Sequence, residues 1–240
     1  DLYSLMNEGA ILAARENRKK VSQYDLIRSI EKVMIGPERK SRLLSEDEKN
    51  ITAYHEGGHA LVASLLPNSD PVHKISIISR GHAAGYTLKL PVEERQFHTR
   101  KEFLDDIAVS LGGYVAELMM FDDLTTGPSN DLQVATALAR DMVSKYGMST
   151  TMGPIAFEAS GGMMMNRGGF VDKDYSQDVA MRIDKEVEKI MNDQLVRARE
   201  LLTKYKPVLD AIAIELMRVE SIEREEFEKL MAESGAVRAD

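Results

Sequence analysis

The segment His55-Glu56-Gly57-Gly58-His59 restricts what this chain can fold into more than any other part of the sequence. Two histidines four residues apart lie on the same face of a helix, so in a helical segment both imidazoles can reach one metal ion. The glutamate after the first histidine can then accept a proton from a water that the metal activates, as in the HExxH motif of zinc peptidases. The segment therefore predicts a helix that carries a catalytic zinc site.

Residues on both sides of this motif favour a helix. Ser45 and Glu48 have the spacing of a capping box, acidic residues occupy the first turn, and Pro67 follows the last apolar position. Two adjacent glycines oppose the helix, because each costs about 1 kcal/mol relative to alanine. We therefore expect Gly57 and Gly58 to allow another backbone segment to approach closely.

The composition excludes several classes of protein and of site. The chain has no cysteine, so any zinc must be bound through nitrogen and oxygen atoms. The formal net charge of −8 argues against a general nucleic-acid surface, which would show a basic stripe, and we expect no nucleic-acid partner. The longest apolar run, Ala60 to Leu66, is too short to span a bilayer, so these residues are expected to form a soluble domain.

Apolar periodicity and capping residues predict a mainly α (α+β) fold, in which a helical domain contains a small β-sheet or hairpin. The expected helices are 2–19, 22–35, 45–67, 99–121, 129–146 and 176–205, with two more after Pro207 and Ser221. Thr99 and Glu102 have the spacing of a second capping box, at the start of the helix 99–121. Ser129 or Asn130 is expected to cap the helix that ends near Tyr146.

Two short runs, 74–78 and 85–90, predict the strands. Ile75, Ile77, Tyr86 and Leu88 alternate with polar residues in these runs. Such alternation is expected for strands that have one buried face.

The motif supplies two metal ligands, and a third must come from elsewhere in the chain. His73, His82 and His98 lie in predicted turns or strand ends, where surface roles suit them better. Two carboxylates remain as candidates for the third ligand. Glu117 lies in an apolar helix, where an unpaired charge would be costly, and Asp131 lies in the first turn of the next helix. An acidic residue in a first turn also stabilises the helix dipole without any metal, so spacing leaves both alternatives open.

Four stretches of the chain resemble the protease end of the FtsH-type, AAA-linked ATP-dependent zinc metalloproteases. They run in family order from Leu5 to Ser149 and read LMNEGAILAARENRKKVSQYDLIRSIEKVMIGPERKSR, TAYHEGGHALVASLLP, HKISIISRGHAAGYTLKLP and TTGPSNDLQVATALARDMVSKYGMS. The resemblance is specific, because the zinc motif, the strand segment and the TTGxSND-type segment recur at separations similar to those of the family.

The resemblance implies a complete set of site residues. It implies that Asp131, the aspartate of the SND element, is the third zinc ligand beside His55 and His59, and that Glu56 is the general base. It also implies that Glu117 supports a metal-bound histidine, because a carboxylate that accepts the free imidazole N–H orients that ligand. The implied activity is zinc-dependent peptide hydrolysis, with Zn²⁺ as the cofactor.

The resemblance also implies that the whole protein is longer than these 240 residues. Residues 1–38 resemble the end of an AAA helical lid, and residues 39–240 resemble the zinc metalloprotease domain. The chain begins with Asp1 rather than methionine and contains no phosphate-binding GxxxxGK[ST] loop. ATP and Mg²⁺ are therefore expected to act only through an AAA module upstream.

The same resemblance predicts partners and a location. The expected partners are unfolded protein or peptide substrates and further copies of the chain in a homo-hexamer. Membrane anchors are expected upstream, which would place the protein at a bacterial inner membrane or an organelle membrane.

Two other functions remain open from the residues. One is a catalytically inactive helical scaffold or assembly module in which the motif survives without metal. The other is a free-standing zinc peptidase with Glu117 as the third ligand. The role of the methionine- and glycine-rich segment Gly161–Gly169, which replaces a stretch that is usually charged in the family, is also open.

Overall fold

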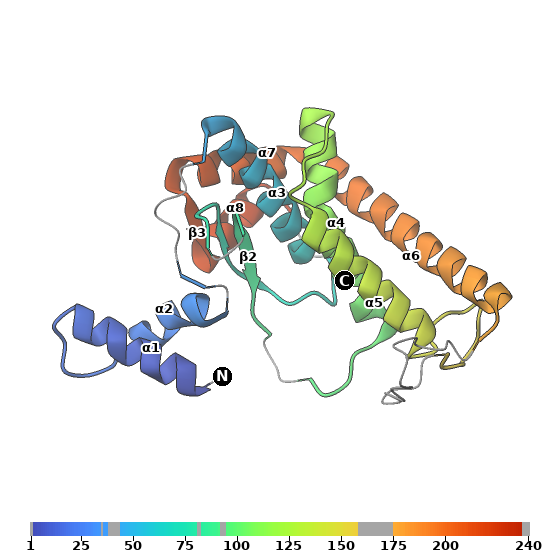
Figure 1. Ribbon diagram of the computed structural model, residues 1–240. Helices are drawn as coiled ribbons and strands as arrows, with labels where there is room; N and C mark the ends of the chain where they lie inside the picture. The colour runs from blue at the N-terminus through green and yellow to red at the C-terminus, as the bar shows by residue number, and fades with distance from the viewer. Residues whose placement is uncertain are drawn as a thin grey trace.

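The computed structural model describes residues 2–34, 36–37, 44–80, 83–91, 95–157 and 175–236, so the Gly161–Gly169 segment lies outside the described residues. In chain order the helices are α1 (Leu2–Arg15), α2 (Gln23–Met34), α3 (Glu46–Leu65), α4 (Arg100–Phe121), α5 (Ser129–Ser144), α6 (Gln177–Lys204), α7 (Lys206–Val219) and α8 (Arg224–Glu233). The strands are β1 (Val72–Ser76), β2 (Tyr86–Lys89) and β3 (Ser221–Glu223). The predicted mainly helical fold with a small sheet is confirmed (Figure 1).

Capping boxes begin two of these helices, as predicted. At α3, the backbone N–H of Glu48 donates to the Ser45 hydroxyl and the backbone N–H of Ser45 donates to the Glu48 carboxylate, and an equivalent pair begins α4. The cap expected at Ser129 or Asn130 is wrong, because both residues lie within α5 and its N-cap is Pro128. The turn before this helix therefore provides no side-chain cap, and other contacts must hold it.

The sheet has the strand order β2-β1-β3, and both pairs of strands are antiparallel. Strand β3 was not predicted, because a helix was expected directly after Ser221 and three residues carry too little periodicity to indicate a strand. In the register, Ile75 lies opposite both Thr87 and Ile222, so these three side chains share one face. Tyr86 and Leu88 are buried on the other face, so β2 alternates as expected. In β1 the neighbours Ile75 and Ser76 are both buried, so the expectation of one buried face is wrong for that strand.

Two apolar clusters hold the helices together. One lies between α3, α7 and the sheet and includes Leu61 and Ile212, and the other joins α4, α5 and α6 through residues such as Ile107 and Met142. Helix α4 packs against α3, α5 and α6 and contributes residues to both clusters, so it joins them (Figure 1). Helices α1 and α2 pack against each other and lie at the left of this view.

Glycines allow α3 and α4 to cross at close range. A Cβ on Gly58 would lie 2.5 Å from the carbonyl oxygen of Gly112, and a Cβ on Gly112 would lie 2.8 Å from the carbonyl oxygen of Gly58. Gly57 differs, because its Cβ would meet side-chain atoms and no backbone, namely Cγ2 of Ile212 and Cδ1 of Leu209, at 3.3 Å from each. The close approach expected of the glycine pair is therefore made by Gly58.

We expect Gly58→Ala to lower the free energy of unfolding by about 1–3 kcal/mol, the range for overpacking, because the new methyl group meets backbone atoms of α4. Gly57→Ala is the matched control, since its methyl group meets side chains at 3.3 Å and no backbone atom, and alanine favours the helix by about 1 kcal/mol. Urea unfolding of both variants measures the difference. Equal losses of stability would show that α3 and α4 do not approach in this way.

Candidate metal centre

Two buried imidazoles face each other on α3. His55 and His59 are one helical turn apart, as the motif predicts, and are 9% and 8% exposed. Their Nε2 atoms are 3.0 Å apart, and their rings meet edge to face with centroids 4.7 Å apart. Both Nε2 atoms therefore border the same small space.

Acceptors on α4 bind the opposite nitrogens of both rings. Nδ1 of His55 lies 2.8 Å from Oε1 of Glu117, and Nδ1 of His59 lies 2.7 Å from the carbonyl oxygen of Val109. A carbonyl or an ionised carboxylate oxygen can only accept a hydrogen bond, so each Nδ1 carries the proton. When a metal ion takes the place of a proton on Nε2, the lone pairs of both Nε2 atoms point into one space, which is the arrangement that binds a metal ion.

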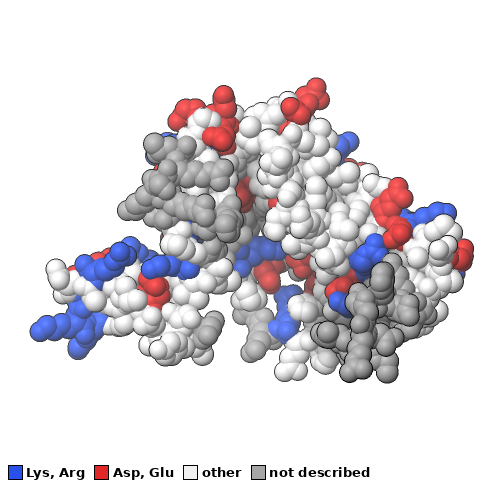
Figure 2. All heavy atoms as spheres, in the orientation of Figure 1, with Lys and Arg blue, Asp and Glu red and all other residues white. Residues whose placement is uncertain are grey.

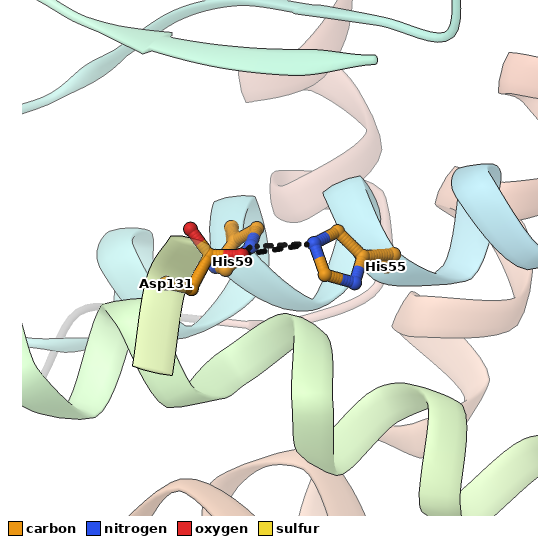
Figure 3. Close-up of side chains that lie close together, drawn as sticks. All are labelled: His55, His59 and Asp131. Carbon is orange, nitrogen blue, oxygen red and sulfur yellow. Dashed lines mark hydrogen bonds and ion pairs between the residues drawn. The ribbon is translucent and has the colours of Figure 1, made fainter. Parts of the chain in front are cut away.

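Asp131 joins the two histidines from a different helix. It is the third residue of α5, and its Oδ2 lies 3.3 Å from Nε2 of His55 and 3.5 Å from Nε2 of His59 (Figure 3). Metal–ligand bonds of about 2.0–2.1 Å in a tetrahedral zinc site place the ligand atoms about 3.3 Å from one another. The three donor atoms therefore have the spacing that a tetrahedral zinc ion requires, with a fourth position left over.

The charges around these atoms favour a cation. Burial disfavours a positive charge on His55, but its bonds to Asp131 and Glu117 outweigh burial and raise the pKa of His55 to about 10. Burial also opposes the ionisation of Asp131, but its bonds to the two histidines hold the pKa of that carboxyl well below its usual range. The site therefore stabilises positive charge where the three donor atoms converge.

Glu117 lies behind His55 and not among the converging donor atoms. Its Oε1 faces Nδ1 of His55, and its Oε2 accepts hydrogen bonds from the backbone N–H and the hydroxyl of Thr125, at 3.0 and 2.9 Å. Burial opposes the ionisation of Glu117, but these bonds outweigh it and lower the pKa of the carboxyl. Glu117 thus has partners for both oxygens, which removes the cost of a buried, unpaired charge.

Thr125 is a residue that the sequence reasoning missed. Besides its two bonds to Glu117, its hydroxyl oxygen accepts a hydrogen bond from the backbone N–H of Gly127 at 2.9 Å. These contacts attach the turn before α5, and so the start of the helix that carries Asp131, to α4. The available signal was its place in the TTGPSND stretch of the family resemblance.

Glu56 is 6% exposed and is bound to the sheet. The hydroxyl of Thr87 on β2 donates to Oε2 of Glu56 at 2.8 Å and also lies 3.1 Å from the backbone carbonyl oxygen of Glu56. Burial raises the pKa of Glu56 despite the neighbouring histidines and this hydrogen bond. The contact between the Thr87 side chain and Glu56 was also missed, because the alternation of the strand placed Thr87 with the polar positions.

Glycine at position 113 makes room for the ring of His55. A Cβ on Gly113 would lie 2.5 Å from Cε1 of that imidazole and 2.7 Å from each ring nitrogen. The two glycines in this turn of α4 therefore have separate uses. Gly112 allows the helices to cross, and Gly113 allows the imidazole to lie flat against α4.

The other histidines are not part of this cluster. His73 lies in β1, His98 is exposed and lies 3.6 Å from Glu102, and His82 lies outside the described residues. Within the described part of the chain, His55, His59 and Asp131 form the group of three side chains close enough to hold one metal ion.

Most of the chain matches known proteins. Residues 42–230 match the model of peptidase family M41. ATP-dependent zinc metalloprotease FtsH 1 of Sphaerobacter thermophilus is 49% identical over 97% of this chain, and ATP-dependent zinc metalloprotease FtsH of Rubrobacter xylanophilus is 43% identical over 97%. The protein of the same name from Bacillus subtilis is 42% identical over 96%. The chain spans 36% of the length of the first two relatives and 37% of the third.

The matched range includes the motif helix and α5, which carry the three converging side chains, and it also includes the sheet. The resemblance noted in the four sequence stretches is thus confirmed over almost the whole length of the chain. The chain therefore belongs to peptidase family M41.

Proposed function

We propose that this chain is the zinc-dependent endopeptidase part of an ATP-dependent protease. The observation that carries this proposal is the convergence of Nε2 of His55, Nε2 of His59 and Oδ2 of Asp131, at 3.0 to 3.5 Å, in a member of a peptidase family. The names of the relatives specify zinc, and two imidazoles with one carboxylate are a donor set that catalytic zinc uses. An inactive scaffold would have no need for such buried and oriented donor atoms.

In this proposal His55, His59 and Asp131 bind zinc, and Glu117 orients His55. The contact between Glu117 and Nδ1 supports this assignment, because Nδ1 lies on the side of the ring away from the converging donor atoms. Glu117 as the third ligand would have to exchange places with Asp131. The arrangement therefore favours Asp131 over the alternative of a Glu117-ligand peptidase.

Peptide hydrolysis follows from these assignments. Zn²⁺ supplies a Lewis acid that polarises the scissile carbonyl and lowers the pKa of water. Glu56 takes a proton from the attacking water as the water oxygen bonds to the carbonyl carbon, and it returns that proton to the amine as the C–N bond breaks. Burial raises the pKa of Glu56, which suits a carboxylate that must both accept and release a proton.

The position of strand β2 in the sheet is an argument for unfolded proteins and peptides as the substrates. It is an outer strand of the described sheet. On the face of the molecule drawn in Figure 2, the surface is hollowed between the lobe that contains the sheet and the lobe that contains α4 and α5. The backbone N–H of Leu90 bonds to Pro71 on the β1 side, so the alternate positions Thr87 and Lys89 direct their backbone groups away from β1. An extended chain can add to such an edge with little dependence on its sequence.

The whole protein is proposed to be a membrane-anchored, ATP-driven ring of six copies. Residues 1–38 would belong to an AAA lid and residues 39–240 to the protease domain, and the start of the family match at residue 42 supports this boundary. None of the helices described above has the length and apolar character needed to cross a bilayer. In this proposal the membrane anchors belong to parts of the whole protein outside these 240 residues, since the relatives are longer than this chain.

Glu56→Gln tests the general base. The variant keeps both histidines and the local shape but removes the proton acceptor, so zinc should stay bound while peptide hydrolysis falls by about 10²-fold or more. Glu46→Gln, on the exposed first turn of the same helix, is the control and should keep full activity. Zinc content and the hydrolysis rate of a fluorogenic peptide are measured together. Comparable rates for the Glu56 variant and the unchanged protein would exclude this role.

The third ligand is tested by comparing Asp131→Ala with Glu117→Gln. Loss of Asp131 removes a donor atom and should reduce zinc affinity by more than about 100-fold, whereas loss of the Glu117 charge should reduce it by about 10–100-fold. Competition with a chelator measures both affinities. If Glu117→Gln loses zinc and Asp131→Ala retains it, the third ligand is Glu117.

Assays with ATP test the proposed division of labour. The sequence has no phosphate-binding loop, so this chain should cleave short peptides and unfolded proteins and leave a stably folded protein intact, with or without ATP. A hexamer with closed symmetry is expected, so light scattering at high micromolar concentration should give the mass of six copies. ATP-dependent degradation of the folded protein would contradict the first part, and a strict monomer would contradict the second.

A further inference from the structure

Thr87 is a polar residue at a position of the sheet that faces the core. It lies opposite Ile75, which lies opposite Ile222 on the third strand, and both isoleucines are 0% exposed. Residues directly opposite one another on neighbouring strands share a face, so the hydroxyl of Thr87 points to the same side as these two apolar side chains. A polar group in such a place needs a partner.

The partner is Glu56. The Thr87 hydroxyl has one proton and two acceptors within reach, the carboxylate oxygen Oε2 of Glu56 at 2.8 Å and the backbone carbonyl oxygen of Glu56 at 3.1 Å. The shorter contact is to the carboxylate, and a hydrogen bond to an ionised group is the stronger of the two kinds. The carboxylate is therefore held from the strand and not by its own helix.

A glutamate side chain has several rotatable bonds, and a general base acts only when its carboxylate lies within hydrogen-bond reach of the proton it takes. Gly85, just before β2, also lies against this side chain, since a Cβ there would be 2.9 Å from Cγ of Glu56. Gly85 thus limits the movement of the Glu56 side chain near its Cγ, and Thr87 binds its carboxylate oxygen.

We propose that Thr87 is a positioning residue, which holds the carboxylate of Glu56 in its working orientation through the hydroxyl group. This inference rests on the proposed role of Glu56 as the general base. Because Thr87 also lies on the outer strand of the sheet, the same residue connects the base to the strand along which an extended substrate would lie.

A merely structural role for Thr87 makes different predictions. If the hydroxyl only satisfies the backbone carbonyl of Glu56 and joins β2 to α3, its loss should lower stability without a selective effect on turnover. Thr52 provides the matched comparison, because it lies one turn before Glu56 on α3 and its hydroxyl donates to the backbone carbonyl of Glu48 at 2.8 Å.

The experiment compares Thr87→Val, Thr87→Ser and the control Thr52→Val in the zinc-loaded 240-residue chain. Valine keeps the shape and the strand preference of threonine but removes the hydroxyl, so kcat should fall by about 10- to 100-fold, the effect of losing a hydrogen bond to a charged group. Zinc content and KM should be unchanged, serine should restore most of kcat, and Thr52→Val should keep the original kcat. Thr87→Ala replaces the valine variant if that variant does not fold.

Crystal structures of the zinc-loaded Thr87 variants give a readout that does not depend on turnover. The carboxylate of Glu56 should keep its orientation in the serine variant and turn away from β2 in the valine variant. An unchanged kcat with an unmoved carboxylate in Thr87→Val would overturn the inference and leave the proposed function standing, and so would equal losses in Thr87→Val and Thr52→Val. No zinc-dependent hydrolysis by the unchanged chain would overturn the proposed function, and the inference with it.

Discussion

The close crossing of α3 and α4 is the contact on which the candidate metal centre depends. The imidazoles lie on α3, whereas the acceptors that orient them, the carboxylate of Glu117 and the carbonyl of Val109, lie on α4. Gly58 and Gly112 set the separation of the two helices where their backbones meet. Hydrogen bonds weaken steeply when they lengthen or bend, so a wider crossing would release both rings together.

Asp131, the third converging side chain, is also connected to the crossing of α3 and α4. Glu117 binds His55 with one oxygen and Thr125 with the other, and Thr125 holds the turn from which α5 and Asp131 begin. A carboxylate that is 1% exposed in an apolar helix is therefore bound on both oxygens. In a low-dielectric interior such a satisfied network is stronger and more rigid than separate hydrogen bonds would be. The buried side chain of Glu117 on α4 thus connects that helix to α3 and to the start of α5.

The sequence predicts those features that depend on residues near one another in the chain. Capping boxes at Ser45 and Thr99 and the histidine pair four residues apart are of this kind, because side chain and backbone interact within one helical turn. Strand β3 is not, because its three residues become a strand only by pairing with β1. Spacing also left Glu117 and Asp131 as equal alternatives, because the packing of α4 and α5 decides which carboxylate faces Nε2. The register that turns Thr87 toward Glu56 likewise depends on pairing and not on local alternation.

The two imidazoles are oriented by groups of different kinds, and this difference affects how the protein can evolve. The ring of His59 is held by the carbonyl of Val109, a backbone atom that every amino acid carries, so a point mutation at that position does not remove it. The ring of His55 is held by a side chain that one nucleotide change can replace. Mutations at positions 117 and 125 can therefore change the orientation of one imidazole of the candidate metal centre. The orientation of the other imidazole depends on the path of the main chain, which such mutations leave in place.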